Sequence, residues 1–282
     1  MTDILTLVFR TFMSQTDVTK DLQATAPSAP SPPTCSTLVL GDHSISRSVL
    51  LLAAVTAASE MGIKVMFFTQ TQIQSLPVSL QKCVPNLSPE SLKKIKFSYP
   101  RTVEELLQQV ASLHESTNTS PSPPSLIIVD RLEAYLCGPG GVSHSGFHPG
   151  EQSCAAHLSA LLCDSSAFLT QLLKQRSSSS APCRLIVSFQ SEVDTVNASG
   201  DAFTTDPILD VLDRYFQVRC TLDRDRSYEA AAAGLQEVWN IYLSGSGITR
   251  ASSTKECEDR PGVAQEWQLL IFPDGLMEFK MV

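Results

Sequence analysis

A short stretch of the chain carries residue types that bind phosphate groups in nucleotide-binding proteins. It lies between an apolar run at residues 37–40 and a helix expected over residues 46–61, which is where a GxxxxGK[ST] loop cradles phosphates. Gly41 and Ser48 fit that template, whereas Ser46 replaces its second glycine and Arg47 replaces its lysine. The candidate nucleotide-binding residues are Gly41, Asp42, His43, Ser44, Ile45, Ser46, Arg47 and Ser48.

Both replacements predict a weakened site. A Cβ atom at position 46 restricts the backbone and crowds a phosphate that must approach the backbone amides closely. The guanidinium of Arg47 is planar and larger than the compact ammonium of lysine, so it does not fill the same space. We therefore expect ATP to bind weakly here and to be hydrolysed very slowly or not at all.

An aspartate at the end of a second apolar run supplies the other half of such a site. Residues 126–129 (LIIV) are followed directly by Asp130. A phosphate-binding loop needs an acidic strand-end residue to help hold Mg²⁺, and the hydroxyl of Ser48 is the expected second ligand. The alternative is an ordinary strand–turn–helix unit in which Asp130 caps a helix.

Apolar runs and helical patterns alternate through most of the chain, so these motifs sit on a recognisable framework. Short, fully apolar strands separated by helices favour a mainly parallel sheet covered on both faces. After residue 215 the pattern changes to strands with little helix between them, and residues 273–275 (PDG) predict the turn of a hairpin. We expect strands over 37–40, 64–68, 95–99, 125–129, 185–189, 215–222, 237–243, 265–272 and 276–282, and helices over 46–61, 102–114 and 154–175.

The first 36 residues differ in composition from the rest. Residues 16–36 are rich in Thr, Ala, Ser and Pro, which bury too little apolar surface to offset the entropy of ordering. We expect residues 1–36 to be a disordered or loosely structured extension, of which the first fifteen residues form an accessory helix or a loose tail. Residues 37–282 are predicted to be a single α/β domain.

Charge and hydropathy narrow the function classes. The formal net charge is −8, which disfavours strong binding to nucleic acid by this chain alone. The eight cysteines are dispersed without a CxxC pair, a pattern typical of reduced, mostly buried thiols. No apolar run approaches the length of about 18 residues that a membrane span needs, so we expect no membrane association.

Several stretches together resemble a known family. They surround the loop and the Asp130 strand, follow the second strand, and recur near the C-terminus. The most distinctive of them is residues 94–100 (KIKFSYP). The chain resembles, over residues 37–282, the SWIM-domain-associated RecA-like recombinase paralogues, the ATPase subunits of the metazoan Shu complex. The residues that carry this resemblance are 38–57, 64–69, 74–77, 92–100, 126–136, 266–267 and 274–275.

The resemblance implies a RecA-like P-loop core, ATP and Mg²⁺ as ligands, and a role in homologous-recombination DNA repair. It also implies a heterodimer with a SWIM-type zinc-finger protein, contact with a RecA-like recombinase, and single-stranded DNA binding with DNA-stimulated ATP hydrolysis. Mammalian members carry an intact GxxxxGKT loop, and this chain does not. We expect a nuclear protein, whose entry would depend on its size or its partner because no Lys/Arg-rich import signal is present.

Two glutamines occupy positions with a role in RecA-like enzymes. Such enzymes place a glutamate after the second strand to orient the attacking water, and this chain has Gln70 in that region and no Asp or Glu between Glu60 and Glu90. Gln190 follows the strand at 185–189 and matches the position that senses the γ-phosphate. The alternative for Gln190 is a polar strand-end residue without a ligand. No catalytic residue is assigned beyond these two.

The expected DNA-binding regions are poor in cations. Residues 131–153 contain Arg131 as their only basic residue, and residues 190–213 contain none. The best basic cluster is a weak DNA-binding candidate, or else simply a solvated face, and a groove shared with the partner would reconcile it with the acidic chain. Its members are Lys93, Lys94, Lys96 and Arg101.

Two further patterns have structural explanations that we favour. His144, His148, Cys154 and His157 have a loose metal-ligand spacing, but mobile loop histidines and a core cysteine explain them better, so no zinc is expected in this chain. Trp239 and Trp267 are expected to be core or interface anchors. The remaining alternatives for function are a genuine ATPase whose missing carboxylate comes from its partner, and a purely structural scaffold with the fold of an ATPase.

Overall fold

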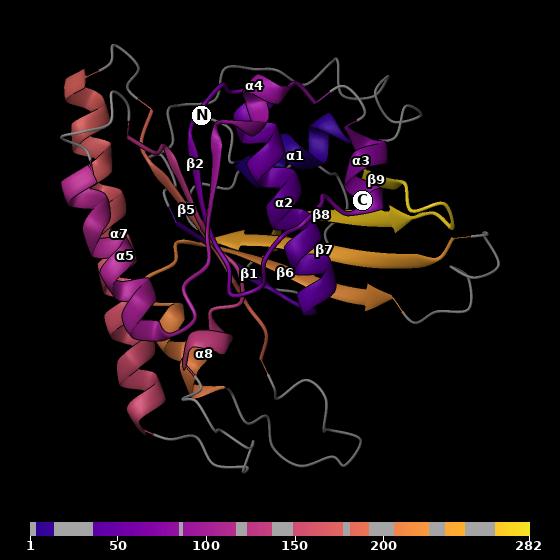
Figure 1. The fold of residues 1–282 in the computed structure, drawn as a ribbon. Helices are drawn as coiled ribbons and strands as arrows, with labels where there is room; N and C mark the ends of the chain where they lie inside the picture. Colours follow the sequence, from indigo (N-terminus) through magenta and orange to yellow (C-terminus); the bar gives the residue numbers. More distant parts are fainter. Residues whose placement is uncertain are drawn as a thin grey trace, which may run out of the picture.

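One mixed sheet with helices on both of its faces organises the chain (Figure 1). The computed structural model describes residues 4–13, 36–84, 87–116, 123–136, 149–176, 181–191, 206–225, 235–245 and 263–282. The nine-stranded sheet has the order β3-β2-β4-β5-β1-β6-β7-β8-β9. The strands are β1 (Ser36–Leu40), β2 (Val65–Phe68), β3 (Ile95–Ser98), β4 (Leu126–Val129), β5 (Arg184–Phe189), β6 (Val218–Asp225), β7 (Glu237–Gly245), β8 (Val263–Ile271) and β9 (Met277–Met281).

The strands from β3 to β6 form the parallel half of the sheet. They are short, and every residue of β4 and β5 is buried. Strands buried on both faces must be apolar throughout, because neither face meets water. The predicted mainly parallel α/β sheet is confirmed.

The antiparallel half begins at β6, which runs parallel to β1 and antiparallel to β7. Strands β7, β8 and β9 continue the antiparallel pairing. The predicted hairpin joins β8 and β9, and Gly275 in its turn has a φ of 87°, a backbone conformation that glycine adopts without strain. The antiparallel extension on the C-terminal side is therefore confirmed.

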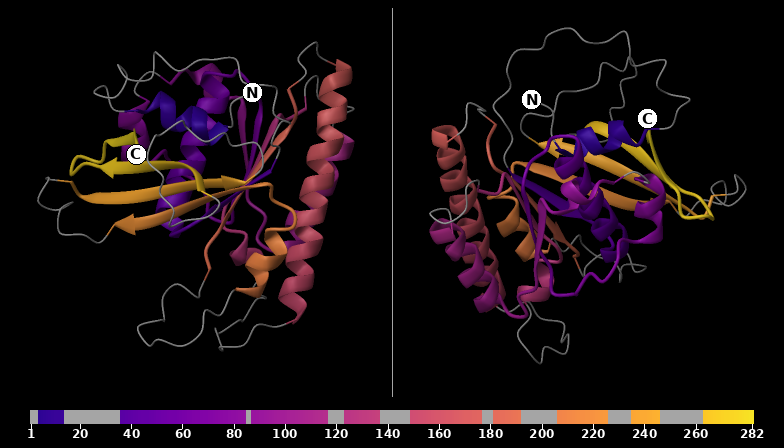
Figure 2. Two further views of the ribbon diagram at one scale, coloured as in Figure 1. Left: turned by 180° about the vertical axis from the view of Figure 1, so that it is seen from behind. Right: turned by 45° about the horizontal axis from the view of Figure 1, so that its top comes forward.

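The helices divide between the two faces of the sheet (Figures 1 and 2). α1, α2 and α3 contribute to the core on one face, and α5, α6, α7 and α8 pack on the other. No helix within the described ranges is both long and apolar enough to cross a membrane. The helices are α1 (Ile4–Thr11), α2 (His43–Ser59), α3 (Val78–Cys83), α4 (Pro89–Leu92), α5 (Val103–Ser116), α6 (Glu133–Leu136), α7 (Pro149–Arg176) and α8 (Pro207–Leu212).

Helix α1 matches one of the two alternatives for the first fifteen residues, an accessory helix, but it is packed into the domain rather than loosely structured. Its Val8 and Phe9 side chains are 0% exposed. The Phe9 ring lies 4.8 Å from that of Phe279 and 5.6 Å from that of Trp267. The antiparallel strands carry large apolar side chains on this face, and α1 covers them, so residues 4–13 belong to the domain. Residues 14–35 of the predicted extension lie outside the described residues.

The two tryptophans are core anchors, as predicted. Trp267 is fully buried and Trp239 is 4% exposed. Each indole N–H donates to a side-chain oxygen two residues away, that of Gln265 or Glu237. Neither ring is free to stack on a nucleic-acid base.

Candidate functional site

Three neighbouring parallel strands bring the predicted residues to one edge of the sheet. β5 lies between β1 and β4, and all three strands run in the same direction. Gly41 follows β1 and Asp130 follows β4, so both sit at the carboxyl ends of their strands. Ligands of open α/β sheets bind at this edge, and the structure places the two predicted motifs together there.

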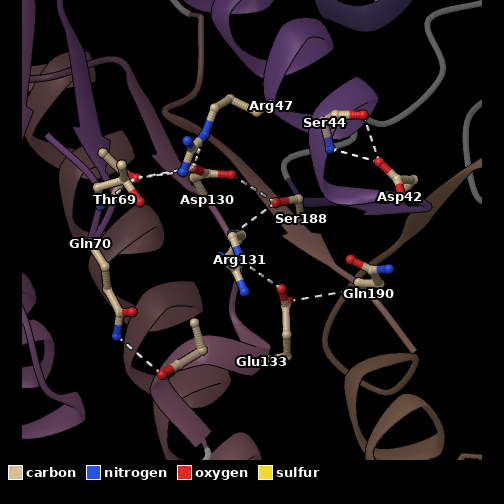
Figure 3. Close-up of polar contacts among 12 residues, drawn as sticks. Asp42, Ser44, Arg47, Thr69, Gln70, Asp130, Arg131, Glu133, Ser188 and Gln190 are labelled. Atoms are coloured by element: carbon tan, nitrogen blue, oxygen red, sulfur yellow. Dashed lines mark hydrogen bonds and ion pairs between the residues drawn. The ribbon is translucent and has the colours of Figure 1, made fainter. Parts of the chain in front are cut away.

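An ion pair joins the two motifs (Figure 3). The Nη2 and Nε atoms of Arg47 lie 2.7 Å and 2.8 Å from Oδ2 of Asp130. The Asp130 side chain is 0% exposed and that of Arg47 is 20% exposed. A buried carboxylate needs a nearby counter-charge, and Arg47 provides it.

Two hydroxyl groups complete the surroundings of Asp130. Thr69, directly after β2, donates from Oγ1 to Oδ2 over 3.0 Å. Ser188 in β5 lies 3.5 Å from Oδ1 and also accepts the backbone N–H of Arg131 over 2.9 Å. The sequence analysis missed Thr69 and Ser188, whose only signal was a polar residue at or near the end of an apolar strand.

The predicted phosphate loop is wound into a helix. α2 was expected to begin at Ser46, and it begins at His43. Asp42 is its N-cap: Oδ1 accepts the backbone N–H of Ser44 over 2.8 Å and the Ser44 hydroxyl over 2.6 Å. The Ser46 N–H is bonded to the Asp42 carbonyl over 3.0 Å. Capping by Asp42 and the absence of a glycine at position 46 both favour this early helix start.

The other loop residues are occupied by the fold. Ile45 is 3% exposed and belongs to the hydrophobic core. Ser48, the expected Mg²⁺ ligand, donates from Oγ to the Ser44 carbonyl over 3.0 Å. The Ser46 hydroxyl and Nδ1 of His43 are buried without a hydrogen-bond partner. Burial lowers the pKa of His43, and the positive charges of Arg47 and Arg131 lower it further.

Gly41 is required by the fold for a reason unrelated to phosphate. Its φ is 151°, and a Cβ atom there would lie 2.8 Å from Cβ and 2.9 Å from the carbonyl oxygen of Leu222 in β6. The chain therefore passes so close to the neighbouring strand that a larger residue does not fit.

Gln70, one of the two possible catalytic residues, has a structural role. Its Nε2 atom donates to the carbonyl oxygens of Arg101 and Ala134 over 3.2 Å and 3.1 Å. These contacts tie the end of β2 to the segment between β3 and α5 and to helix α6. An amide held in this way is not presented as a base to a water molecule.

Gln190, the other possible catalytic residue, borders a half-buried acid, Glu133, that the sequence analysis missed. Its backbone N–H donates to Glu133 over 3.2 Å, and Arg131 contacts the same carboxylate over 3.2 Å. Burial raises the pKa of Glu133 above its ordinary value. The signal in the sequence was its place three residues after Asp130, where a helix begins.

The arrangement as it stands does not fit bound Mg²⁺·ATP. The cation position beside Asp130 is taken by the guanidinium of Arg47, and the backbone N–H groups of Ser44 and Ser46 already donate to Asp42, the cap of α2. A carboxylate, that of Asp42, stands at the helix N-terminus, where a phosphate would carry the same sign of charge.

Two curated relatives share much of the sequence. The ATPase SWSAP1 of Mus musculus is 37% identical over 190 residues, which cover 67% of this chain and 58% of the mouse protein. The ATPase SWSAP1 of Homo sapiens is 34% identical over 190 residues, which cover 67% of this chain and 71% of the human protein. The chain belongs to the SWSAP1 family. The family resemblance predicted from the sequence is thereby confirmed, although the chain spans less than two thirds of the mouse protein.

Other comparisons add little to the SWSAP1 assignment. No family model matches the chain. A KaiC-like protein of Pyrococcus horikoshii, known from a crystal structure, is 10% identical; the match covers 88% of this chain and 90% of that one with a TM-score of 0.48.

In this SWSAP1 family member the predicted basic residues lie along one edge of the sheet. Lys93 and Lys94 precede the edge strand β3, Lys96 lies within it, and Arg101 follows it. Lys93, Lys96 and Arg101 are exposed and Lys94 is half-buried. They are therefore spread over both ends and the middle of this edge strand.

The alternative zinc site is only partly covered by the structure. His144 and His148 lie outside the described residues. Cys154 is half-buried in α7 and His157 is exposed on the same helix. No group of three potential metal ligands occurs among the residues that the structure describes.

Proposed function

We propose that this chain is a RecA-like recombinase paralogue of homologous-recombination DNA repair. It acts in the nucleus in a heterodimer with a SWIM-type zinc-finger protein and supports a RecA-like recombinase on single-stranded DNA. Membership of the SWSAP1 family and the parallel sheet with its strand-end acid support this proposal. The nucleotide site is degenerate, binds ATP with Mg²⁺ weakly, and hydrolyses it slowly or not at all.

The ion pair between Arg47 and Asp130 carries the proposal of a weak site. Both of its members are residues that a working site would direct at the ligand, and here they contact each other at 2.7 Å. A ligand must separate a buried pair before it gains any contact, which lowers its apparent affinity. The same observation supports a second candidate function, a purely structural scaffold, which differs only in binding no nucleotide.

The charge distribution supports DNA binding by the complex rather than by this chain alone. A chain with a net charge of −8 repels phosphates over most of its surface. Along β3 the exposed Lys93, Lys96 and Arg101 provide a local exception. A groove that combines this edge with basic residues of the partner would bind the sugar–phosphate backbone without reading its sequence.

The test is co-purification with the SWIM-type partner, followed by fluorescence anisotropy with labelled single-stranded DNA. We expect a stable heterodimer that binds DNA more tightly than either chain. Lys93→Glu with Lys96→Glu should weaken binding about tenfold and make it less sensitive to salt, because fewer phosphate contacts form. The matched control is Lys174→Glu with Lys280→Glu, which makes the same charge change at exposed sites on α7 and β9.

The outcomes separate the parts of the proposal. Failure of the two chains to co-purify contradicts the partner assignment. Equal loss of DNA binding in both double variants contradicts a role for the β3 edge and indicates a general effect of net charge.

A further inference from the structure

Two side chains of the predicted nucleotide site carry the charges that Mg²⁺ and a phosphate group would bring. We propose that Arg47 takes the place of the metal cation at Asp130 and that the Asp42 carboxylate takes the place of a phosphate at the N-terminus of α2. The site is thereby kept closed to nucleotide by the protein itself. This inference rests on the proposed function and deepens it, because it names the cause of the weak nucleotide affinity.

The cationic half of the replacement is complete. Asp130 has its charge balanced by Arg47, and Oδ2 of Asp130 accepts bonds from both Arg47 and Thr69. Burial, and after it the positive charges of Arg47 and Arg131, lowers the pKa of the neighbouring His43 and favours its neutral imidazole. A further cation at Asp130 would be repelled by the guanidinium of Arg47 and would find the carboxylate already engaged.

The anionic half is equally well formed. Asp42 accepts hydrogen bonds from the hydroxyl and the backbone N–H of Ser44, and both bonds, the hydroxyl bond most, lower the pKa of the carboxyl group, so the charge persists at neutral pH. The carboxylate therefore meets the positive end of the α2 dipole, as a bound phosphate would. A phosphate that approached the same amides would be repelled by Asp42.

Burial fixes this arrangement. Opening a phosphate loop requires the first turn of α2 to unwind, and Ile45 in that turn is 3% exposed within the core. Ser46 is 2% exposed, so its side chain already fills the space that a glycine would leave. The closed form is thus stabilised by packing as well as by charge.

The experiment compares the full-length wild-type chain with variants that remove the replacements one at a time. Asp42→Asn keeps a capping side chain and removes its charge. Ser46→Gly with Arg47→Lys restores the GxxxxGK[ST] pattern. Asp210→Asn, an exposed charge in α8, is the matched control for the loss of one negative charge. The probe is Mg²⁺·ATP, followed by titration calorimetry and by the shift of the thermal midpoint, with circular dichroism as the check on folding.

We expect the wild-type chain and Asp210→Asn to bind weakly and to show no thermal shift. Asp42→Asn should bind about two- to fivefold more tightly, which is the strength of one charge at a helix end. The Ser46→Gly/Arg47→Lys variant should gain about tenfold or more, with dependence on Mg²⁺. If that variant does not fold, the isosteric Asp42→Asn still tests the anionic half, and Arg47→Lys alone, which keeps a positive charge beside Asp130, tests the cationic half.

One result would contradict the replacement of ligand charges, and a different result would contradict the weak nucleotide site. Folded variants that bind no more tightly than a weakly binding wild-type chain would show that the internal charges are not the cause, and the proposed weak site would stand. Tight Mg²⁺-dependent binding by the wild-type chain would instead contradict the weak site itself.

Discussion

Half-buried Arg47 of α2 forms an ion pair with the buried Asp130 at the end of β4, although the two residues lie 83 positions apart in the sequence. At the carboxyl edge of the sheet the pair spans β5, the strand that lies between β4 and β1, the strand that α2 follows. It joins the helix that follows β1 to the strand that would hold a metal. Residues of the predicted nucleotide site therefore stabilise the fold itself.

Removing Arg47 should destabilise the protein strongly. Arg47→Ala leaves Asp130 buried without a counter-charge, at an expected cost of about 3–5 kcal/mol in the free energy of unfolding. Urea denaturation measures this loss. Arg219→Ala removes a partner from the more exposed pair with Asp213 and should cost no more than about 1 kcal/mol. Equal losses in the two variants would contradict the structural role of the Arg47 pair.

Helix α1 should be essential for stability. Phe9→Ala deletes a fully buried ring that packs against Trp267 and Phe279, with an expected loss of about 3–5 kcal/mol. Arg10→Ala changes an exposed neighbour on the same helix and should alter stability by less than about 0.5 kcal/mol. Guanidinium denaturation with tryptophan fluorescence follows both variants. A loss below about 1 kcal/mol for Phe9→Ala would show that α1 is peripheral.

Gly41 should resist substitution even when nucleotide is absent. Gly41→Ala places a Cβ against the Leu222 backbone and strains a φ of 151°, so the protein should lose about 2 kcal/mol or more. Gly150→Ala in α7 is the control, because nothing lies within 4 Å of its added Cβ, and it should leave stability unchanged or slightly raised. Thermal unfolding of both variants without ligand measures the difference. A Gly41→Ala variant as stable as the wild type would contradict the close approach to Leu222 as the reason for this glycine.

Glu133 should make stability depend on pH. Its folded pKa is raised above the ordinary 4.5 by burial, so the folded protein holds this proton more tightly than the unfolded chain does. Its contribution to stability is therefore greatest below the unfolded pKa and is lost as pH rises through the folded pKa. Glu133→Gln removes this titration, so the stability of the variant relative to wild type should improve from pH 4 upward until the carboxyl group is fully ionised.

Denaturation of both proteins at several pH values between about 4 and 8 provides the measurement. Glu237→Gln, in a partly exposed pair with Arg224, is a suitable control. The stability difference from wild type should change more with pH for Glu133→Gln than for Glu237→Gln. A difference between wild type and Glu133→Gln that stays constant with pH would contradict the burial of an ionisable group at this position.

The sequence by itself determined the class of fold and the position of the site on it. Runs such as residues 126–129 are apolar at every position because neither face of the strand meets water, so the residue types alone identify such a strand. A parallel order of strands then places Gly41 and Asp130 at the same edge, so their proximity also followed from the sequence. The family could also be predicted from the sequence, because its motifs are short stretches of neighbouring residues.

Only the tertiary structure decided what the site residues contact. The sequence contained Arg47 and Asp130, but an ion pair depends on a distance across the sheet that no local pattern encodes. The start of α2 at His43 depends on the cap at Asp42 and on Ile45 finding a place in the core. The sequence alone did not decide whether residues 4–11 form a helix or a loose tail. A helix of eight residues is stable only when it packs on an apolar surface, here the face of β8 and β9.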